Sequence, residues 1–360
     1  MIFVKSEDLK YGMRLAKPIY NKTGVLLYER NTRLTLQGIE SVKNFGLLGL
    51  YILEPAEPVP PMTEEDLDFE RFQTMAVFSI REELDNIIAG REPVNLKRLA
   101  NAIITNYGRL DHKITFTQNL RSTTDYVYKH VINTAILCAL ISAQVYYTPT
   151  EQEELVLAAL LHDIGKLLLP NKVREKYDDY DTNDLIIVKK IQNDGLGLLR
   201  PEIGIDSGVR RIVAQIHRME YGNSNLEQGK ILKSTKILKV ANLFDTMTCM
   251  KISEEAISEI AAIKYLLLNK DEFDEEIVGA LIKSINILTP GVCIELTNRE
   301  KGLVISENLR PVVLGFSTNK IYDLSNNGVY RRYQIVDIMK TMDNRIKVDR
   351  ERLEEYMNKR

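Results

Sequence analysis

Hydrophobic residues recur at helical spacing in almost every segment of this chain between residues 71 and 288. An amphipathic helix must bury its apolar face against other elements, so a long series of such segments predicts a helical bundle. The clearest segments span residues 125–145, 151–166, 209–219, 234–250 and 273–288. We therefore expect a mainly α fold built around one large helical domain.

The residues before this region predict a small α/β module and a linker. Short apolar stretches flank an Asn-Lys-Thr-Gly turn at residues 21–24, and a helical pattern covers residues 36–45. The segment 54–61 contains four prolines, which neither a helix interior nor a central strand accommodates. Thr63 and Asp66 have the spacing of a capping box, so a helix should begin beside them.

A small β segment is expected after the helical domain. Thr-Pro-Gly at residues 289–291 breaks the helical pattern, and short strand-like stretches follow. The charged stretch 348–359 has a helical composition. The predicted parts are an α/β module at 1–54, a linker at 55–70, the helical domain at 71–288, and a β segment with a C-terminal helix at 289–360.

Composition disfavours several other classes of protein. The net charge is -2 and no long basic run occurs, so DNA and RNA polymers are not expected as partners. Cys138, Cys249 and Cys293 lie far apart in apolar segments, which is typical of reduced core residues. The longest apolar stretch, 131–145, is shorter than a membrane span, and the N-terminus lacks a secretory signal pattern. We therefore expect a cytoplasmic protein without a membrane span.

The most informative polar residues are His162 and Asp163, which follow an otherwise apolar helical segment. Imidazole nitrogens and carboxylates are good ligands for Zn, Mn or Fe, and Lys166 can direct its ammonium toward an anionic oxygen. A capping Asp beside a buried His is also a common structural arrangement, so this pair alone is a weak signal.

Two further segments strengthen the metal hypothesis. His130 lies on a second amphipathic segment with Asn133 one turn later, and Asn242 and Asp245 share a third. Asn133 and Asp245 are expected to orient neighbouring groups by hydrogen bonds.

Together these segments resemble the HD-superfamily phosphohydrolases, and within them the HD-GYP proteins, which hydrolyse the bacterial second messenger cyclic di-GMP. The resemblance rests on Tyr-x-Tyr-x-His-x-x-Asn at 126–133, Ala-Leu-Leu-His-Asp-Ile-Gly-Lys at 159–166, and Leu-x-Val-Ala-x-x-Phe-Asp at 238–245. It implies an HD-type helical bundle with metal ligands at His130, His162 and Asp163, and a catalytic role for Asp163 and Lys166.

The chain departs from the HD-GYP pattern at several expected ligands. Of a His-His-Glu motif only His217 remains, and we expect it to be a partly buried polar side chain, with a ligand role as the alternative. The Gly-Tyr-Pro loop corresponds to residues 221–226, which lack that motif. The other changed positions are Ile191, Ile216, Arg218 and Asn242.

These losses predict an incomplete metal site. A two-metal site needs ligands for both ions, so we expect at most one divalent ion (Mn, Fe or similar), or none. Its ligands would be His130, His162 and Asp163, with Asn242 as a weak fourth.

Three functional hypotheses follow. The first is a degenerate HD-GYP-like signalling protein, with little or no phosphodiesterase activity, that binds cyclic di-GMP, another nucleotide or a signalling protein partner. The second is a mononuclear, metal-dependent phosphohydrolase acting on a nucleotide or another phosphate ester. The third is a structural helical adaptor.

Overall fold

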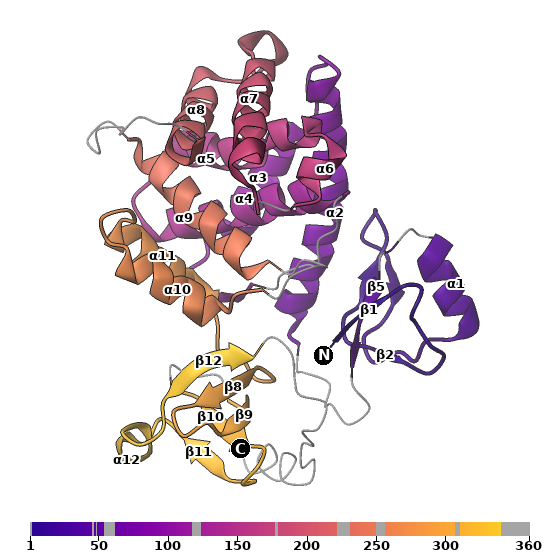
Figure 1. Ribbon diagram of the computed structural model, residues 1–360, viewed down its shortest axis with the longest axis vertical. Helices are drawn as coiled ribbons and strands as arrows, with labels where there is room; N and C mark the ends of the chain where they lie inside the picture. The colour runs from indigo at the N-terminus through magenta and orange to yellow at the C-terminus, as the bar shows by residue number, and fades with distance from the viewer. Residues whose placement is uncertain are drawn as a thin grey trace. The chain divides into compact units, whose positions relative to one another are not determined.

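The computed structural model in Figure 1 contains a helical part and two small β-containing parts. It describes residues 2–44, 47, 49–53, 62–116, 124–176, 179–221, 231–249, 256–306 and 310–339. Contacts divide the chain into two compact units. One comprises residues 72–257 and 262–285, and the other comprises residues 1–71, 258–261 and 286–360.

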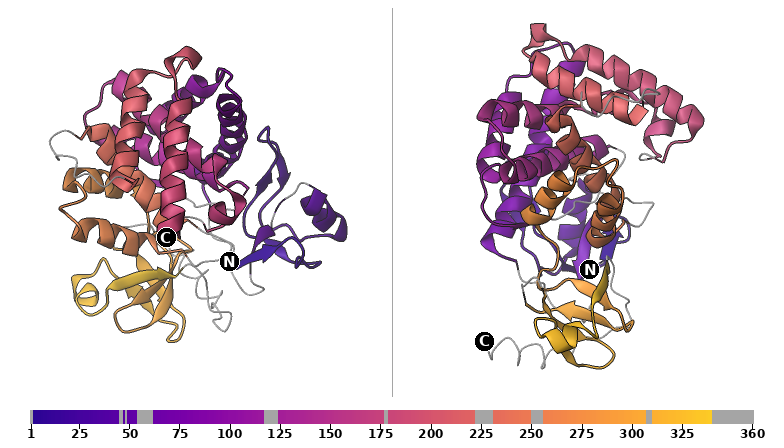
Figure 2. Two further views of the ribbon diagram at one scale, coloured as in Figure 1. Left: turned by 45° about the horizontal axis from the view of Figure 1, so that its top comes forward. Right: turned by 90° about the vertical axis from the view of Figure 1, so that its left-hand side faces the viewer.

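The helical unit is built around one buried helix, α4 (Tyr126–Gln144). It packs against α3, α5, α9 and α11, while α7 and α8 lie side by side (Figure 2). The remaining elements are α2 (Glu64–Ile88), α3 (Leu96–Tyr107), β6 (Ile114–Thr115), α5 (Pro149–Leu161), η1 (Ile164–Leu168), α6 (Asn171–Arg174), α7 (Thr182–Leu198), η2 (Pro201–Ile203), α8 (Ser207–Tyr221), α9 (Lys233–Thr248), α10 (Glu259–Leu268) and α11 (Glu275–Ser284).

Among the described residues, α4 is also the one helix long and apolar enough to cross a membrane. The apolar stretch 131–145 alone is shorter than a membrane span, but the helix that contains it has 19 residues. Length therefore does not show whether α4 crosses a membrane. In that window 89% of the residues are buried inside the protein, as in the core helix of a bundle.

Helix α5 has a sharp beginning and an early end. Thr148 and Glu151 form a capping box, and Pro149 occupies the first helical turn, where its missing N–H costs nothing. The helical pattern predicted for residues 151–166 is interrupted, because α5 ends at Leu161 and the chain continues as the short 3₁₀ helix η1.

Two glycines explain how η1 packs on α7. A Cβ atom added to Gly195 would lie 2.6 Å from Cα of Gly165, and one added to Gly165 would lie 2.7 Å from Cα of Gln192. No side chain fits at either glycine, so the two backbones lie in direct contact. This contact sets the position of the residues after Asp163.

The N-terminal module combines two small sheets with one helix. An antiparallel sheet has the order β1 (Ile2–Lys5), β5 (Gly49–Leu53), β2 (Arg14–Leu15), and β3 (Ile19–Tyr20) pairs with β4 (Leu26–Tyr28). Helix α1 (Leu36–Asn44) contributes Ile39 and Val42 to their shared core.

The C-terminal module is one antiparallel sheet of order β11-β10-β9-β8-β12. Its elements are β8 (Cys293–Leu296), β9 (Lys301–Val304), β10 (Val312–Gly315), β11 (Ile321–Asp323), α12 (Asn327–Tyr330) and β12 (Ile335–Met339), and the short β7 (Ile285–Asn286) directly follows α11. Ile294, Val304 and Val313 are fully buried in its core.

The predicted mainly α fold with small modules at both ends is confirmed. The capping box of Thr63 and Asp66 forms, with backbone to side-chain hydrogen bonds of 2.8 and 3.1 Å. Helix α2 therefore begins at Glu64, so the predicted linker 55–70 is wrong over residues 64–70. The proline-rich segment 54–61 and the predicted helix 348–359 lie outside the described residues. The other domain boundaries stay predictions.

Candidate metal centre

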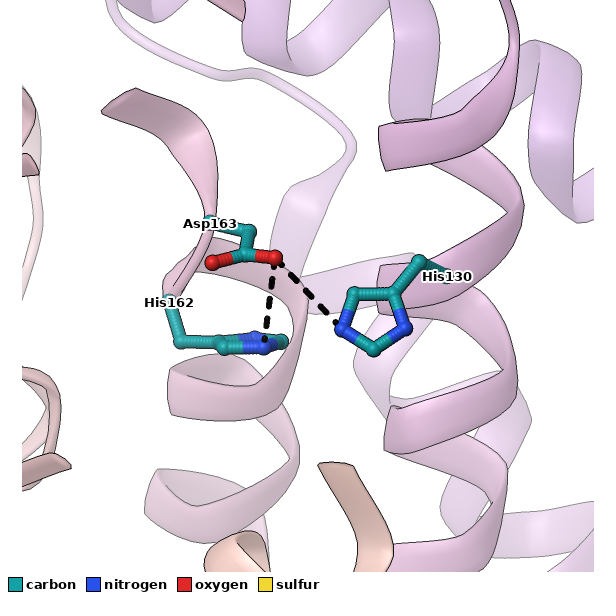
Figure 3. A group of neighbouring side chains, drawn as sticks. All are labelled: His130, His162 and Asp163. Atoms are coloured by element: carbon teal, nitrogen blue, oxygen red, sulfur yellow. Dashed lines mark ion pairs between the residues drawn. The ribbon is translucent and has the colours of Figure 1, made fainter. Parts of the chain in front are cut away.

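The C-terminal end of α5 and the N-terminal part of α4 bring together His130, His162 and Asp163 (Figure 3). Their ligand atoms all lie within 4.8 Å of one another, and all three side chains are buried. Oδ2 of Asp163 lies 3.5 Å from Nε2 of His130 and 3.8 Å from Nε2 of His162. His130 and the adjacent pair His162 and Asp163, which lie on different helical elements, thus direct one donor atom each toward a common point.

A hydrogen bond to Asp245 on α9 orients His130. Its Nδ1 atom donates to Oδ2 of Asp245 at 2.6 Å, which leaves Nε2 facing Asp163. Oδ1 of Asp245 accepts from Asn133 at 3.0 Å, and Asn133 accepts from Gln73 at 2.8 Å. Asp245 and Asn133 therefore make the orienting bonds that the sequence predicts. A carboxylate behind a histidine in this way is typical of metal sites.

His162 presents an available nitrogen to the same point. Its Nδ1 atom donates to the backbone oxygen of Ala159 at 2.8 Å, so Nε2 carries the lone pair. Within the described part of the chain, this buried Nε2 has no hydrogen-bond partner. Burial lowers the pKa of His162 to about 4, so the ring is neutral at physiological pH. A buried nitrogen in this state suits a metal ligand.

The two oxygens of Asp163 have different neighbours. Oδ1 accepts a hydrogen bond of 2.8 Å from the Gln192 amide on α7, whereas Oδ2 pairs with the Lys166 ammonium at 2.9 Å. Burial opposes the charged form of Asp163, but Lys166 and the two imidazoles outweigh it and lower the pKa of this carboxyl. Asp163 is therefore an anionic group held in place from two sides.

His217 and Asn242 lie on helices that pack around this cluster. Nε2 of His217 donates to the backbone oxygen of His162 at 2.6 Å, and its buried Nδ1 has no partner among the described residues. Burial also lowers the pKa of His217. The Asn242 side chain donates to Glu220 on α8. Their ligand roles stay predictions.

Two of the positions at which the sequence departs from the HD-GYP pattern, Ile191 and Ile216, lie in apolar surroundings. Ile191 packs against a cluster formed by Leu169, Val173 and Val188, and Ile216 is fully buried. Arg218 is exposed, and residues 222–226 lie outside the described residues. Neither isoleucine can contribute a metal ligand.

Sequence reasoning did not identify Gln192 and Gln73. Both are buried glutamines on helices, at 1% and 0% exposure, and both hydrogen-bond within or behind the cluster. No motif pointed to either, because a single glutamine in an amphipathic pattern is most often a surface residue.

The three donor atoms fit a single divalent ion. Two ligands of one ion at about 2.0 to 2.2 Å each can be at most about 4.4 Å apart. The distances of 3.5 and 3.8 Å from Oδ2 of Asp163 to the two histidines lie within this limit, and the whole set of donor atoms lies within 4.8 Å, which is close to it. Two histidines and one carboxylate, with coordination positions left over, form a donor set that catalytic single-metal sites use.

Comparison with known proteins gives a consistent family. The family model of the HD domain matches residues 97–277. A cyclic di-GMP phosphodiesterase of Pseudomonas aeruginosa, PA4108, is 21% identical over 222 residues, which are 61% of this chain and 53% of that protein. The response regulator RpfG of Xanthomonas campestris, also a cyclic di-GMP phosphodiesterase, is 26% identical over 152 residues, 41% of this chain and 40% of its own length.

A third relative, the cyclic di-GMP phosphodiesterase PdeB of Borreliella burgdorferi, is 22% identical over 191 residues, 51% of this chain and 49% of that protein. This chain thus spans about half the length of the curated relatives it matches. Among solved structures, Bd1817, an HDG"Y"P protein from Bdellovibrio bacteriovorus, aligns with a TM-score of 0.48 and 17% identity, over 78% of this chain and 97% of that one.

Proposed function

This chain belongs to the HD domain family, within its HD-GYP subgroup, and we propose that it is a bacterial signalling protein that binds one divalent metal ion and hydrolyses cyclic di-GMP slowly or not at all. The observation that carries the proposal is that one site combines three converging metal ligands with apolar residues at other expected ligand positions. His130, His162 and Asp163 still converge, while the positions of further expected ligands hold Ile191 and Ile216.

The residues of the cluster suit the binding of an ion such as Mn or Fe. Nε2 of His162 offers a lone pair, Asp163 offers the negative charge, and Asp245 fixes the ring of His130. Such an ion supplies Lewis-acid polarisation of a phosphoryl oxygen. Lys166, only 6% exposed and paired with Asp163, is placed to contact an anionic oxygen of a ligand beside the cluster.

Slow hydrolysis is expected because Ile191 and Ile216 cannot bind a second ion at the positions where the HD-GYP pattern has ligands. Two-metal sites stabilise both the attacking and the leaving oxygen of the phosphoryl group, and a single ion does not stabilise both in this way. We therefore infer that the chain acts mainly through binding, with cyclic di-GMP or another nucleotide as ligand and a signalling protein as partner. A cytoplasmic location is part of this proposal.

A second function, hydrolysis of a different phosphate ester by one metal ion, is favoured by the orientation of the ligands. His130 is fixed by Asp245, and Asp163 by Gln192 and Lys166. Such preorganisation is what a mononuclear hydrolase requires. A purely structural role is less consistent with the site, because a buried, unpaired nitrogen such as Nε2 of His162 costs about 1 to 3 kcal/mol.

Metal analysis and hydrolysis assays on the same preparations test both proposals. We expect one ion per chain in the wild type and none in the double variant His162→Ala, Asp163→Ala. With Mn²⁺ or Fe²⁺ added, cyclic di-GMP should be cleaved slowly or not at all. Rapid cleavage that Asp163→Ala abolishes would falsify the first proposal. Metal-dependent cleavage of nucleoside phosphates or bis(p-nitrophenyl) phosphate, with cyclic di-GMP left intact, would support the second.

A further inference from the structure

Gln192 is a buried glutamine that contacts the metal cluster from α7. Its Nε2 atom donates to Oδ1 of Asp163 at 2.8 Å, and the residue is only 1% exposed. Its Oε1 atom is buried and has no hydrogen-bond partner among the residues that the structure describes. A buried amide used on one side only is costly, so its position calls for an explanation beyond packing.

The glycine contact between η1 and α7 holds Gln192 against Asp163. A Cβ on Gly165 would lie 2.4 Å from Oε1 of Gln192 and 2.7 Å from its Cα. Gly195, one turn further along α7, touches the backbone of Gly165 in the same way. With the helix held so closely, the side chain of Gln192 has little space in which to leave Asp163.

The rotation of α7 about its own axis decides which of its residues faces Asp163. Ile191 packs against Val188, Leu169 and Val173, while Gln192 faces the carboxylate. Successive residues of a helix point about 100° apart, so only one of the two can face the cluster. Here that residue donates a hydrogen bond instead of offering a lone pair.

The hydrogen bond from Gln192 gives the two oxygens of Asp163 different neighbours. Oδ1 is engaged by the amide, and Oδ2 faces the Nε2 atoms of His130 and His162 at 3.5 and 3.8 Å. A carboxylate that bridges two ions needs one oxygen for each of them. An amide N–H directed at Oδ1 occupies the place where a second cation would have to bind.

We propose that Gln192 is a positioning residue that directs Oδ2 of Asp163 toward the two histidines and limits the site to one divalent ion. This inference rests on the proposed function in one respect, namely that a divalent ion binds at His130, His162 and Asp163. The further step is that the hydrogen bond from Gln192 to Asp163 limits the number of bound ions, in addition to the isoleucines at expected ligand positions.

Calorimetric titration of the whole metal-free chain, residues 1–360, with Mn²⁺ tests the proposal. Gln192→Met keeps the length of the side chain and removes the donor. We expect the wild type to bind one ion, and the variant to bind it about 10 to 100 times more weakly, because an outer hydrogen bond that orients a ligand has an effect of that size. Circular dichroism should show the same helix content for both proteins.

Gln152 on α5 provides the matched control. It is 8% exposed, and its amide donates to the backbone oxygen of Gly108 and to Ser142, so it is a buried, hydrogen-bonded glutamine outside the cluster. Gln152→Met should leave the Mn²⁺ affinity within about twofold of the wild type, since it removes no bond to a metal ligand.

Gln192→Glu tests the limit to one ion. It has the same size but replaces the donor by a carboxylate, which repels Asp163 until a cation lies between them. The new carboxylate lies beside Oδ1 of Asp163 and supplies a ligand that a second ion lacks in the wild type, so we expect this variant to bind two Mn²⁺ ions. A wild type that binds one ion, with Gln192→Met equal to it in affinity or Gln192→Glu still binding one, would overturn the inference and leave the proposed function standing. A wild type that binds no ion would overturn both.

Discussion

Nδ1 of His130 lies 2.6 Å from Oδ2 of Asp245, and neither side chain is exposed to solvent. The bond joins α4 to α9 over 115 residues of sequence, and it selects the tautomer in which Nε2 of His130 carries the lone pair. Asp245 is itself held by Asn133, so its orientation does not depend on His130 alone. We therefore expect the carboxylate on α9 to affect the metal affinity of the cluster.

Asp245→Asn should weaken metal binding without removing a ligand. An amide at this position presents an N–H either to Nδ1 of His130 or to the amide nitrogen of Asn133, so one of the two bonds is lost. We expect Mn²⁺ to bind about 10 to 100 times more weakly, measured as a smaller rise in melting temperature at a fixed Mn²⁺ concentration. Asp194→Asn, an exposed change on α7, should keep the full rise.

The metal-free protein should lose stability in mild acid because of His162. Burial lowers the pKa of this side chain from 6.5 to about 4, so between these values the unfolded chain binds a proton that the folded chain does not. The free energy of unfolding is therefore highest above about pH 6.5 and falls as the pH drops toward 4, by on the order of 3 kcal/mol.

Urea unfolding in EDTA at several pH values between 4 and 7 measures this slope. His162→Gln has no proton to bind at this position, so its free energy of unfolding should vary less with pH. His112→Gln, at an exposed histidine beside Asp111, should keep the slope of the wild type. Equal slopes in all three proteins would mean that His162 is not the buried neutral group described above.

Much of the fold could be predicted from hydrophobic periodicity and end signals. The segment predicted at 125–145 is α4, and the one at 209–219 is α8, each within a few residues of its bounds. The end of α5 at Leu161 agrees with the expectation that His162 and Asp163 follow an apolar helical segment. The close contact between Gly165 and Gly195 could not be predicted, because the two glycines lie on different elements. A one-dimensional pattern does not contain that contact.

Gly195→Ala should destabilise the protein while Gly197→Ala should not. A Cβ at position 195 would meet the backbone of Gly165 at 2.6 Å, which forces η1 and α7 apart at a cost of about 1 to 3 kcal/mol. At Gly197, on the same helix, no atom lies within 4 Å of the added Cβ. That change should leave the free energy of unfolding within about 1 kcal/mol of the wild type, with a gain if anything. Chemical denaturation of the three proteins decides this comparison.

Sequence motifs indicate the residues of the candidate site that belong to them. They do not indicate a residue such as Gln192, whose position depends on how α7 is rotated. His130, His162 and Asp163 each belong to a recognisable segment, and the family model of the HD domain matches the part of the chain that contains them. Gln192 was missed because the sequence alone does not show whether position 191 or 192 faces Asp163. That choice follows from how α7 is seated on η1.

Restoring the lost ligands should increase the metal content of the protein. The variant carries Ile191→His, Ile216→His, Arg218→Glu and Asn242→Asp, and its helices keep their remaining apolar residues. Ile216 is fully buried and Ile191 packs in an apolar cluster, so each new imidazole costs about 1 to 3 kcal/mol until it finds a partner. The metal-free variant should therefore melt at a lower temperature than the parent.

Added Mn²⁺ or Fe²⁺ should restore the melting temperature of this variant, because an ion that binds only the folded state stabilises it in proportion to the logarithm of its concentration. Elemental analysis should also find more metal per chain than in the parent. Ile186→His, at an isoleucine of α7 that is 66% exposed, adds an imidazole away from the cluster and should change neither measurement. If the fourfold variant gains no metal and its melting temperature does not respond to added ions, positions 191, 216, 218 and 242 do not converge on the pocket of His130, His162 and Asp163. The cluster would then be a site for one ion that does not derive from a two-ion site, and Ile191 and Ile216 would not occupy former ligand positions.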